Sequence, residues 1–218
     1  REIIATRITN SLINRMGDTF IAELAEKTGM PVATIVRAFV IAREVYGVRS
    51  IWQEIEALDN KIDAGVQTAM LIEINNLLER GTLWFMNNGA AGLGIDQHIR
   101  EYGGGVGQLS KEINDVIPAY YQNDLAKRAK VFMDSSVPKA LAFRISGLVN
   151  LNAGCDVVRL ASARKLSVSA IARVYFVVGA QFKFGRLRYI AEGLGAEGYW
   201  QQLAADALIE ESFKQQLN

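Results

Sequence analysis

Apolar residues recur every three to four positions along most of the chain, which is the spacing that places them on one face of an α-helix. No segment shows the strict alternation of apolar and polar residues that is typical of a half-buried strand. The pattern therefore predicts an all-α fold, a multi-helix bundle of about twelve to thirteen helices. We expect these helices at residues 2–16, 19–28, 32–46, 49–59, 64–88, 95–102, 106–117, 119–134, 137–151, 154–164, 168–182, 185–194 and 198–217.

Glycine and proline mark several of the predicted helix ends. Gly29 and Gly47 follow segments with helical periodicity, and glycine accepts the left-handed conformation that often closes a helix. Pro31 is expected in the first turn of a helix, where its missing N–H group removes no hydrogen bond. Pro118 and Pro138 indicate two further helix starts. These positions support the boundaries that the apolar pattern predicts.

Two glycine-rich stretches, GAAGLG at 89–94 and GGGVG at 103–107, are candidates for phosphate binding. Neither matches the G-x-G-x-x-G spacing of a dinucleotide site, neither follows a predicted strand, and neither has the lysine of a phosphate loop. We therefore interpret both stretches as flexible turns that bound a short helix at 95–102.

A weak internal repeat relates the two ends of the chain. Residues 11–58 align without a gap with residues 147–194, and identical residues include Leu24 with Leu160. The alignment predicts two related four-helix units that flank a helical insertion; the alternative is one compact domain overall. The predicted parts are helical unit A at 1–58, the insertion at 59–146 with the long helix 64–88, and helical unit B at 147–218.

The stretch LAEKTGMPVATIVRAF at 24–39 resembles the helix-turn-helix of DNA-binding proteins, with Gly29 at the turn and Pro31 at the start of the second helix. A recognition helix needs a polar or basic face toward the major groove. On a helical wheel, however, the neighbours of Arg37 are mostly apolar, so we expect a core helix in a buried helical hairpin. A stand-alone helix-turn-helix DNA-binding regulator is kept as an alternative function.

Charge, hydropathy and cysteine content argue against a nucleic-acid-binding, a membrane-spanning or a disulfide-bonded protein. The chain has 24 Lys and Arg against 23 Asp and Glu, so it lacks the basic excess of proteins that bind nucleic acid mainly through phosphates. No apolar run reaches the roughly 18 residues that span a bilayer. We therefore expect neither nucleic acid nor a membrane as a partner. A single cysteine, Cys155, excludes an intrachain disulfide and favours a reducing, cytoplasmic location.

Residue types that usually carry catalysis are scarce and isolated. His98 is the only histidine, and we interpret it as a surface residue on a short polar helix rather than a metal ligand or an acid–base group. Cys155 has no histidine near it in sequence, so a small apolar core residue is a better interpretation than a nucleophile. We therefore predict no catalytic, cofactor-binding or metal-ligating residue in this chain.

Arg37 and Arg173 occupy the same position of the repeat, each on a mostly apolar helix. Such an arginine is a candidate anion contact, because its planar guanidinium binds carboxylates and phosphates. A helical small-ligand sensor, with an effector pocket between the two repeat units, is therefore another alternative function. The competing interpretation is that each arginine forms a salt bridge at the edge of the core.

Several phrases of the sequence, taken in order, resemble the C-terminal region of the large bacterial NAD-specific glutamate dehydrogenases. The resemblance extends over nearly the whole chain, from Arg1 to about Gln216, but it does not cover the loop at 89–94. The phrases are REIIATRITNSLINRMGDTF, RAFVIAREVYGV, IEALDNKI, LLERGTLW, VPKALAFRISGLVNL, CDVVRLA, VYFVVGAQF and WQQLAADAL.

The resemblance implies a parent protein that oxidises glutamate to 2-oxoglutarate and ammonia while it reduces NAD. It also implies that the nucleotide-binding and catalytic segments lie before this region, so no catalytic residue of the family maps onto this chain. The start at Arg1 rather than Met fits this expectation of a piece of a longer polypeptide. We therefore expect a non-catalytic helical module that contacts the upstream catalytic domains, supports assembly or regulation, and belongs to a homo-oligomer.

Overall fold

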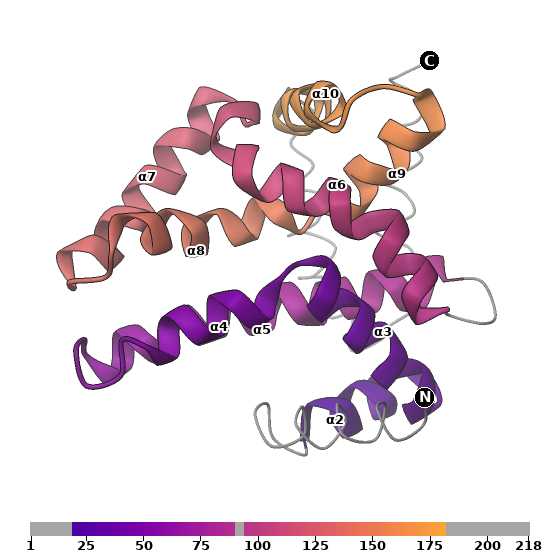
Figure 1. Cartoon of the computed structure of the whole chain (residues 1–218), viewed down its shortest axis with the longest axis horizontal. Coiled ribbons are helices and arrows are strands. Elements are labelled where there is room, and N and C mark those ends of the chain that lie inside the picture. Colours follow the sequence, from indigo (N-terminus) through magenta and orange to yellow (C-terminus); the bar gives the residue numbers. More distant parts are fainter. Residues whose placement is uncertain (1–18, 90–93, 182–218) are drawn as a thin grey trace.

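The computed structural model describes residues 19–89 and 94–181, and Figure 1 shows how their helices are arranged. The described residues form nine helices and no strand, which confirms the all-α prediction. Three predicted helices, 2–16, 185–194 and 198–217, lie outside the described residues. Within the described ranges, every helix is too short or too polar to span a bilayer. The helices are α2 (Thr19–Thr28), α3 (Val32–Val45), α4 (Val48–Glu56), α5 (Ala64–Asn88), α6 (Ile95–Val116), α7 (Ala119–Asp134), α8 (Lys139–Leu151), α9 (Gly154–Arg164) and α10 (Val168–Gln181).

Local sequence signals place many helix ends where they were predicted. Gly29 and Gly47 adopt left-handed φ angles of 66° and 62° in the short connections after α2 and α3. Pro118 and Pro138 stand directly before α7 and α8, where a missing N–H group is tolerated. The start of α5 is capped by Asp63, whose carboxylate accepts a hydrogen bond of 2.8 Å from the backbone N–H group of Gly65.

The helix α6 corrects the prediction of two helices separated by a glycine turn. Residues 103–107 lie in the middle of one continuous helix, so the expected helices 95–102 and 106–117 are a single element. A Cβ atom built on Gly105 would lie only 2.6 Å from Cγ2 of Val158 on α9. Glycine at this position therefore lets α6 and α9 pack closely, which a larger residue would prevent.

The helix α6 also has a central place in the described part of the chain. It packs against α3, α8, α9 and α10, and Figure 1 shows it crossing the middle of the molecule. Buried apolar side chains form one cluster that extends from Leu24 on α2 to Phe176 on α10. The largest side chains that are fully buried include Phe39, Phe85, Ile41, Ile74 and Leu109.

The two described portions of the repeat form helical hairpins with matching boundaries. The pair α2–α3 aligns with the pair α9–α10, and the connections hold a left-handed residue at the same position, Gly29 with φ 66° and Lys165 with φ 54°. Burial differs between the copies. The helix α3 is a core helix, as predicted, whereas α10 is only partly buried and leaves Val174 and Val177 exposed. The division into units A and B around an insertion stays a prediction.

Candidate functional site

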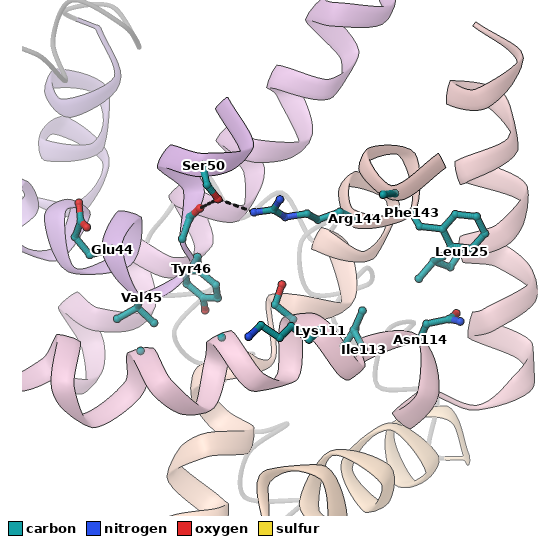
Figure 2. A pocket seen from close by; sticks show the side chains of 15 residues that line it. Glu44, Val45, Tyr46, Ser50, Lys111, Ile113, Asn114, Leu125, Phe143 and Arg144 are labelled. Atoms are coloured by element: carbon teal, nitrogen blue, oxygen red, sulfur yellow. Dashed lines mark hydrogen bonds between the residues drawn. The ribbon is translucent and has the colours of Figure 1, made fainter. Parts of the chain in front are cut away.

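A pocket of about 590 Å³ opens between the α3–α4 corner on one side and α6, α7 and α8 on the other (Figure 2). Its volume lies within the range of about 300–1,000 Å³ that is usual for small-molecule sites. The lining combines buried apolar side chains with a few polar and charged groups, which is the composition of a binding site. Because α6 supplies a large part of the lining, the central helix connects the pocket to the core.

One polar edge of the pocket is formed by a connection between α8 and α4. The guanidinium of Arg144 on α8 donates a hydrogen bond of 2.6 Å to Oγ of Ser50, and it also donates to the carboxylate of Glu54. Ser50 in turn donates to the backbone carbonyl of Gly47 at 3.1 Å. Figure 2 shows the Arg144 side chain reaching toward Ser50. This network holds the guanidinium of Arg144 in place in the lining of the pocket.

A second cation lies on α6. The exposed ammonium of Lys111 lines the pocket and makes no hydrogen bond or ion pair with the residues that the structure describes. The carboxylate of Glu44 also lines the pocket, but it already pairs with Arg43 at 2.7 Å. Among the charged groups of the lining, Arg144 is paired with Glu54 and Glu44 is paired with Arg43, so Lys111 carries the positive charge that no described residue pairs with.

The inner wall of the pocket is apolar. Val45, Ile113 and Leu125 are buried, and the half-buried ring of Phe143 completes this surface. On α6, Gly107 contributes no side chain, and a Cβ atom built there would have no other atom within 4 Å. The space at Gly107 is therefore open, and a larger residue would extend into it.

Tyr46 and Cys155 form a buried polar pair beside the pocket. The hydroxyl of Tyr46, which lines the pocket, donates a hydrogen bond to Sγ of Cys155 at 3.3 Å. Burial raises the pKa of the Cys155 thiol to about 12 and raises the pKa of Tyr46 well above its usual value of 10.0. Cys155 is 0% exposed, which confirms the prediction of a core residue. Burial therefore favours the neutral form of both groups.

His98 differs from its prediction as a surface residue on a short polar helix. It lies in the first turn of the long helix α6 and is half-buried, with Nδ1 at 2.9 Å from the carbonyl oxygen of Gly94. Its ring stacks on Tyr102 at a centroid distance of 6.4 Å and meets the edge of Phe85 at 6.0 Å. The surface interpretation is wrong because apolar rings from α5 and α6 enclose one side of the imidazole.

A polar joint connects α5 to α9. The indole N–H group of Trp84 donates to the carboxylate of Asp156 at 2.8 Å, and Arg159 donates to the same oxygen at 3.2 Å. The guanidinium of Arg159 also lies over the Trp84 ring, 5.7 Å from its centroid. We interpret this joint as structural, because its charged groups bind one another and hold the two helices together. Across the described ranges, no group of three or more His, Cys, Asp and Glu residues could hold a metal ion.

The two arginines predicted as anion contacts lie on the surface. Arg37 is exposed on α3 and Arg173 is exposed on α10, and neither lines the pocket. Arg173 contributes to a lowered pKa of Glu112, after hydrogen bonds from Ser169 and Gln108. The role of both arginines as anion contacts stays a prediction.

Sequence reasoning did not select the groups that line the pocket. Lys111 and Arg144 are charged residues on amphipathic helices, and such residues usually face solvent. Ser50 and Arg144 meet only after α4 and α8 have packed on the core. A search for solitary cations next to glycines on the same helix face would have found Lys111, which follows Gly107 by one helical turn.

Comparison with known proteins gives matches over the full chain. The family described as "Glutamate dehydrogenase, C-terminal" matches residues 1–218. The NAD-specific glutamate dehydrogenase of Halomonas elongata is 30% identical over 217 residues, and that of Pseudomonas aeruginosa is 28% identical over 211 residues. The enzyme of the same name from Mycobacterium tuberculosis is 23% identical over 213 residues. These alignments cover 100%, 97% and 98% of the chain, but the chain spans only 13% of the length of each relative.

Proposed function

The chain belongs to the family of glutamate dehydrogenase C-terminal domains, and from this premise we propose that it is the non-catalytic helical part of an NAD-specific glutamate dehydrogenase. The proposed parent reaction converts L-glutamate, NAD and water to 2-oxoglutarate, ammonia and NADH. The observation that carries the proposal is the match of the whole chain to relatives of this name, of which it spans 13%.

The described helices support a role outside the chemical step. The described ranges contain no strand, whereas a dinucleotide pyrophosphate is usually held where a strand turns into a helix. Burial favours the neutral forms of Tyr46 and Cys155, which supports a role other than that of a base or a nucleophile. In this proposal, NAD and glutamate bind to other parts of the polypeptide, in the cytoplasm.

Exposed apolar side chains favour an assembly role. Tyr120 and Val131 on α7, Ile72 on α5 and Val149 on α8 are all exposed in the described structure. Large apolar side chains on a surface often pack against another domain or subunit. We therefore propose that this chain contacts the catalytic domains of the same polypeptide and contributes to a homo-oligomer.

The proposal is tested by comparing the complete polypeptide with a variant that lacks this chain. Sedimentation gives the mass of the assembly, and absorbance of NADH gives glutamate-dependent turnover. We expect the shortened protein to form a smaller assembly or to turn over more slowly, and we expect the separate chain to form no NADH. Glutamate-dependent formation of NADH by the separate chain would contradict the proposal, as would an unchanged mass together with unchanged turnover.

Of the two alternative functions, a DNA-binding regulator is not favoured. The second helix of the predicted motif, α3, buries seven of its residues, including Ile35 and Phe39, and it is covered by α5 and α6. The small-ligand sensor is favoured by one observation, the pocket that Lys111 and Arg144 line. This pocket lies between the α3–α4 corner and α6–α8, whereas the effector pocket considered from the sequence lay between the two repeat units.

A further inference from the structure

We propose that the pocket between the α3–α4 corner and α6–α8 is a regulatory site for a small organic carboxylate. The acid group would lie between Lys111 and Arg144, and the organic part would lie against the apolar wall at Leu125 and Phe143. The regulatory role rests on the proposed function, whereas the binding of the carboxylate is a property of this chain alone.

The charges of the pocket select an anion. Lys111 brings a positive charge that no described residue neutralises, so an anion gains an ion pair there without displacing one. The carboxylate of Glu44 repels an anion less strongly than an unpaired carboxylate would, because Glu44 is paired with Arg43.

Arg144 has hydrogen-bond donors left for a ligand. A guanidinium carries five N–H donors, and the structure uses one on each of the two terminal nitrogens, toward Glu54 and Ser50. These contacts also hold the Arg144 side chain in place before a ligand arrives, which reduces the entropy lost on binding. A carboxylate is planar and accepts two parallel hydrogen bonds from such a group.

The apolar wall selects an organic acid over inorganic phosphate. Leu125, Ile113 and Phe143 offer no hydrogen bonds to the oxygens of a phosphate ion. The ring of Phe143 is only half-buried, so its exposed part is removed from water when an organic body covers it. The pocket volume of about 590 Å³ is also much larger than a single inorganic ion requires. Figure 2 shows Phe143 and Leu125 at one end of the pocket, with Arg144 and Lys111 nearer its middle.

A carboxylate bound to both Arg144 and Lys111 would connect three helices, α4, α6 and α8. The ion pair between Arg144 and Glu54 joins α8 to α4. A ligand carboxylate that accepts hydrogen bonds from Arg144 therefore either displaces Glu54 or shares the guanidinium with Glu54. Lys111 lies on α6, which packs on α3, α8, α9 and α10. Binding can therefore change how α4 and α8 sit against the central helix, which is the physical basis of a regulatory effect.

The test is protection of Lys111 from acetylation in the complete polypeptide, measured by mass spectrometry. The probe is sodium benzoate, with sodium chloride at equal ionic strength as the reference and neutral benzamide as a matched compound without charge. We expect benzoate to slow the acetylation of Lys111 about fivefold at about four times its Kd, because protection follows 1 + [L]/Kd. Lys127 on α7 is an exposed internal control that does not line the pocket, and its rate should not change.

Variants separate the pocket from a general charge effect. Arg144→Gln removes one cation, and Gly107→Leu places a side chain in the open space; both should abolish the protection of Lys111. The matched controls are Arg100→Gln and Gly104→Leu, which change exposed positions of α6 outside the pocket and should leave the protection intact.

Each outcome supports or overturns the site. Protection by benzoate alone that is lost in Arg144→Gln and Gly107→Leu supports it. Equal protection by benzamide, equal protection by inorganic phosphate, no protection by benzoate, or protection that persists in Arg144→Gln overturns it. Glutamate-dependent NADH formation is measured in the same samples, so a polypeptide without dehydrogenase activity but with protected Lys111 would refute the proposed function and keep the carboxylate site.

Discussion

Tyr46 shows how a single side chain connects the core to the pocket. It is buried, it lines the pocket, and its hydroxyl donates to Cys155 at 3.3 Å. Gly81 gives the ring its space, because a Cβ atom on Gly81 would lie 2.6 Å from the ring, whereas one on Gly154 would lie at an ordinary contact distance of 3.6 Å. A ligand that contacts Tyr46 in the pocket would therefore meet a side chain that packs against α5 and α9.

The Cys155 thiol should be almost unreactive in the folded chain. Burial raises its pKa to about 12, so very little thiolate is present at pH 8, and the side chain is also closed to reagents. We expect alkylation by iodoacetamide to be at least about 100-fold slower in the folded chain than in urea. Mass spectrometry at successive times measures both rates, and rapid alkylation of the folded chain would contradict the described burial.

Glu112 should make the contact between α6 and α10 sensitive to acid. Hydrogen bonds from Ser169 on α10 and from Gln108 lower the pKa of Glu112 below its usual value of 4.5. A carboxyl group with a lowered pKa stabilises the fold above its unfolded pKa, and this contribution is lost as the pH falls through the folded pKa.

We therefore expect hydrogen exchange of α10 to accelerate relative to that of α5 as the pH falls below 4.5, after correction for intrinsic rates. Glu112→Gln should weaken this pH dependence, whereas Asp124→Asn on the exposed face of α7 should keep it. An unchanged pH profile in Glu112→Gln would show that the carboxylate does not hold the two helices together.

Among the elements, α6 departs most from what its sequence suggests. Four glycines at 103–107 lower its intrinsic helix propensity, yet the helix runs unbroken from Ile95 to Val116. Its contacts with α3, α8, α9 and α10 compensate for the weak local preference. Tertiary packing therefore decides the structure of this element.

Two adjacent glycines of α6 should respond oppositely to alanine. Gly105→Ala places a methyl group 2.6 Å from Val158, and we expect it to destabilise the fold by about 1–3 kcal/mol. Gly104→Ala has open space around it and should stabilise the fold by about 0.5–1 kcal/mol through helix propensity. Urea unfolding of both variants measures the difference, and equal effects would contradict the close packing of α6 on α9.

The sequence was sufficient for elements whose signals are local. The helix α5 was predicted at its observed bounds, 64–88, because apolar residues repeat along it at helical spacing. Pocket residues such as Ser50 and Arg144 were missed because their contact depends on how α4 and α8 pack, which no local pattern records. The same holds for Gly105, whose role is visible only next to Val158.

At the scale of the whole molecule, the described helices enclose one apolar core and also leave several large apolar side chains exposed on their surface. Val131 and Tyr120 on α7, Ile72 on α5 and Val177 on α10 are exposed. The chain spans 13% of the length of its relatives. Other domains of such a longer polypeptide are therefore candidates to cover these exposed side chains. In the proposed function, NAD and glutamate bind to that remainder, and this chain serves assembly and regulation.

The most direct measurement of this central claim is an NAD titration of the polypeptide with and without this chain, followed by fluorescence. If the chain is non-catalytic, the shortened polypeptide should bind NAD with a Kd within about threefold of that of the complete protein, which is less than about 0.7 kcal/mol. Loss of saturable NAD binding, in a shortened polypeptide that keeps its folded spectrum, would contradict the account and place part of the cofactor site in this chain.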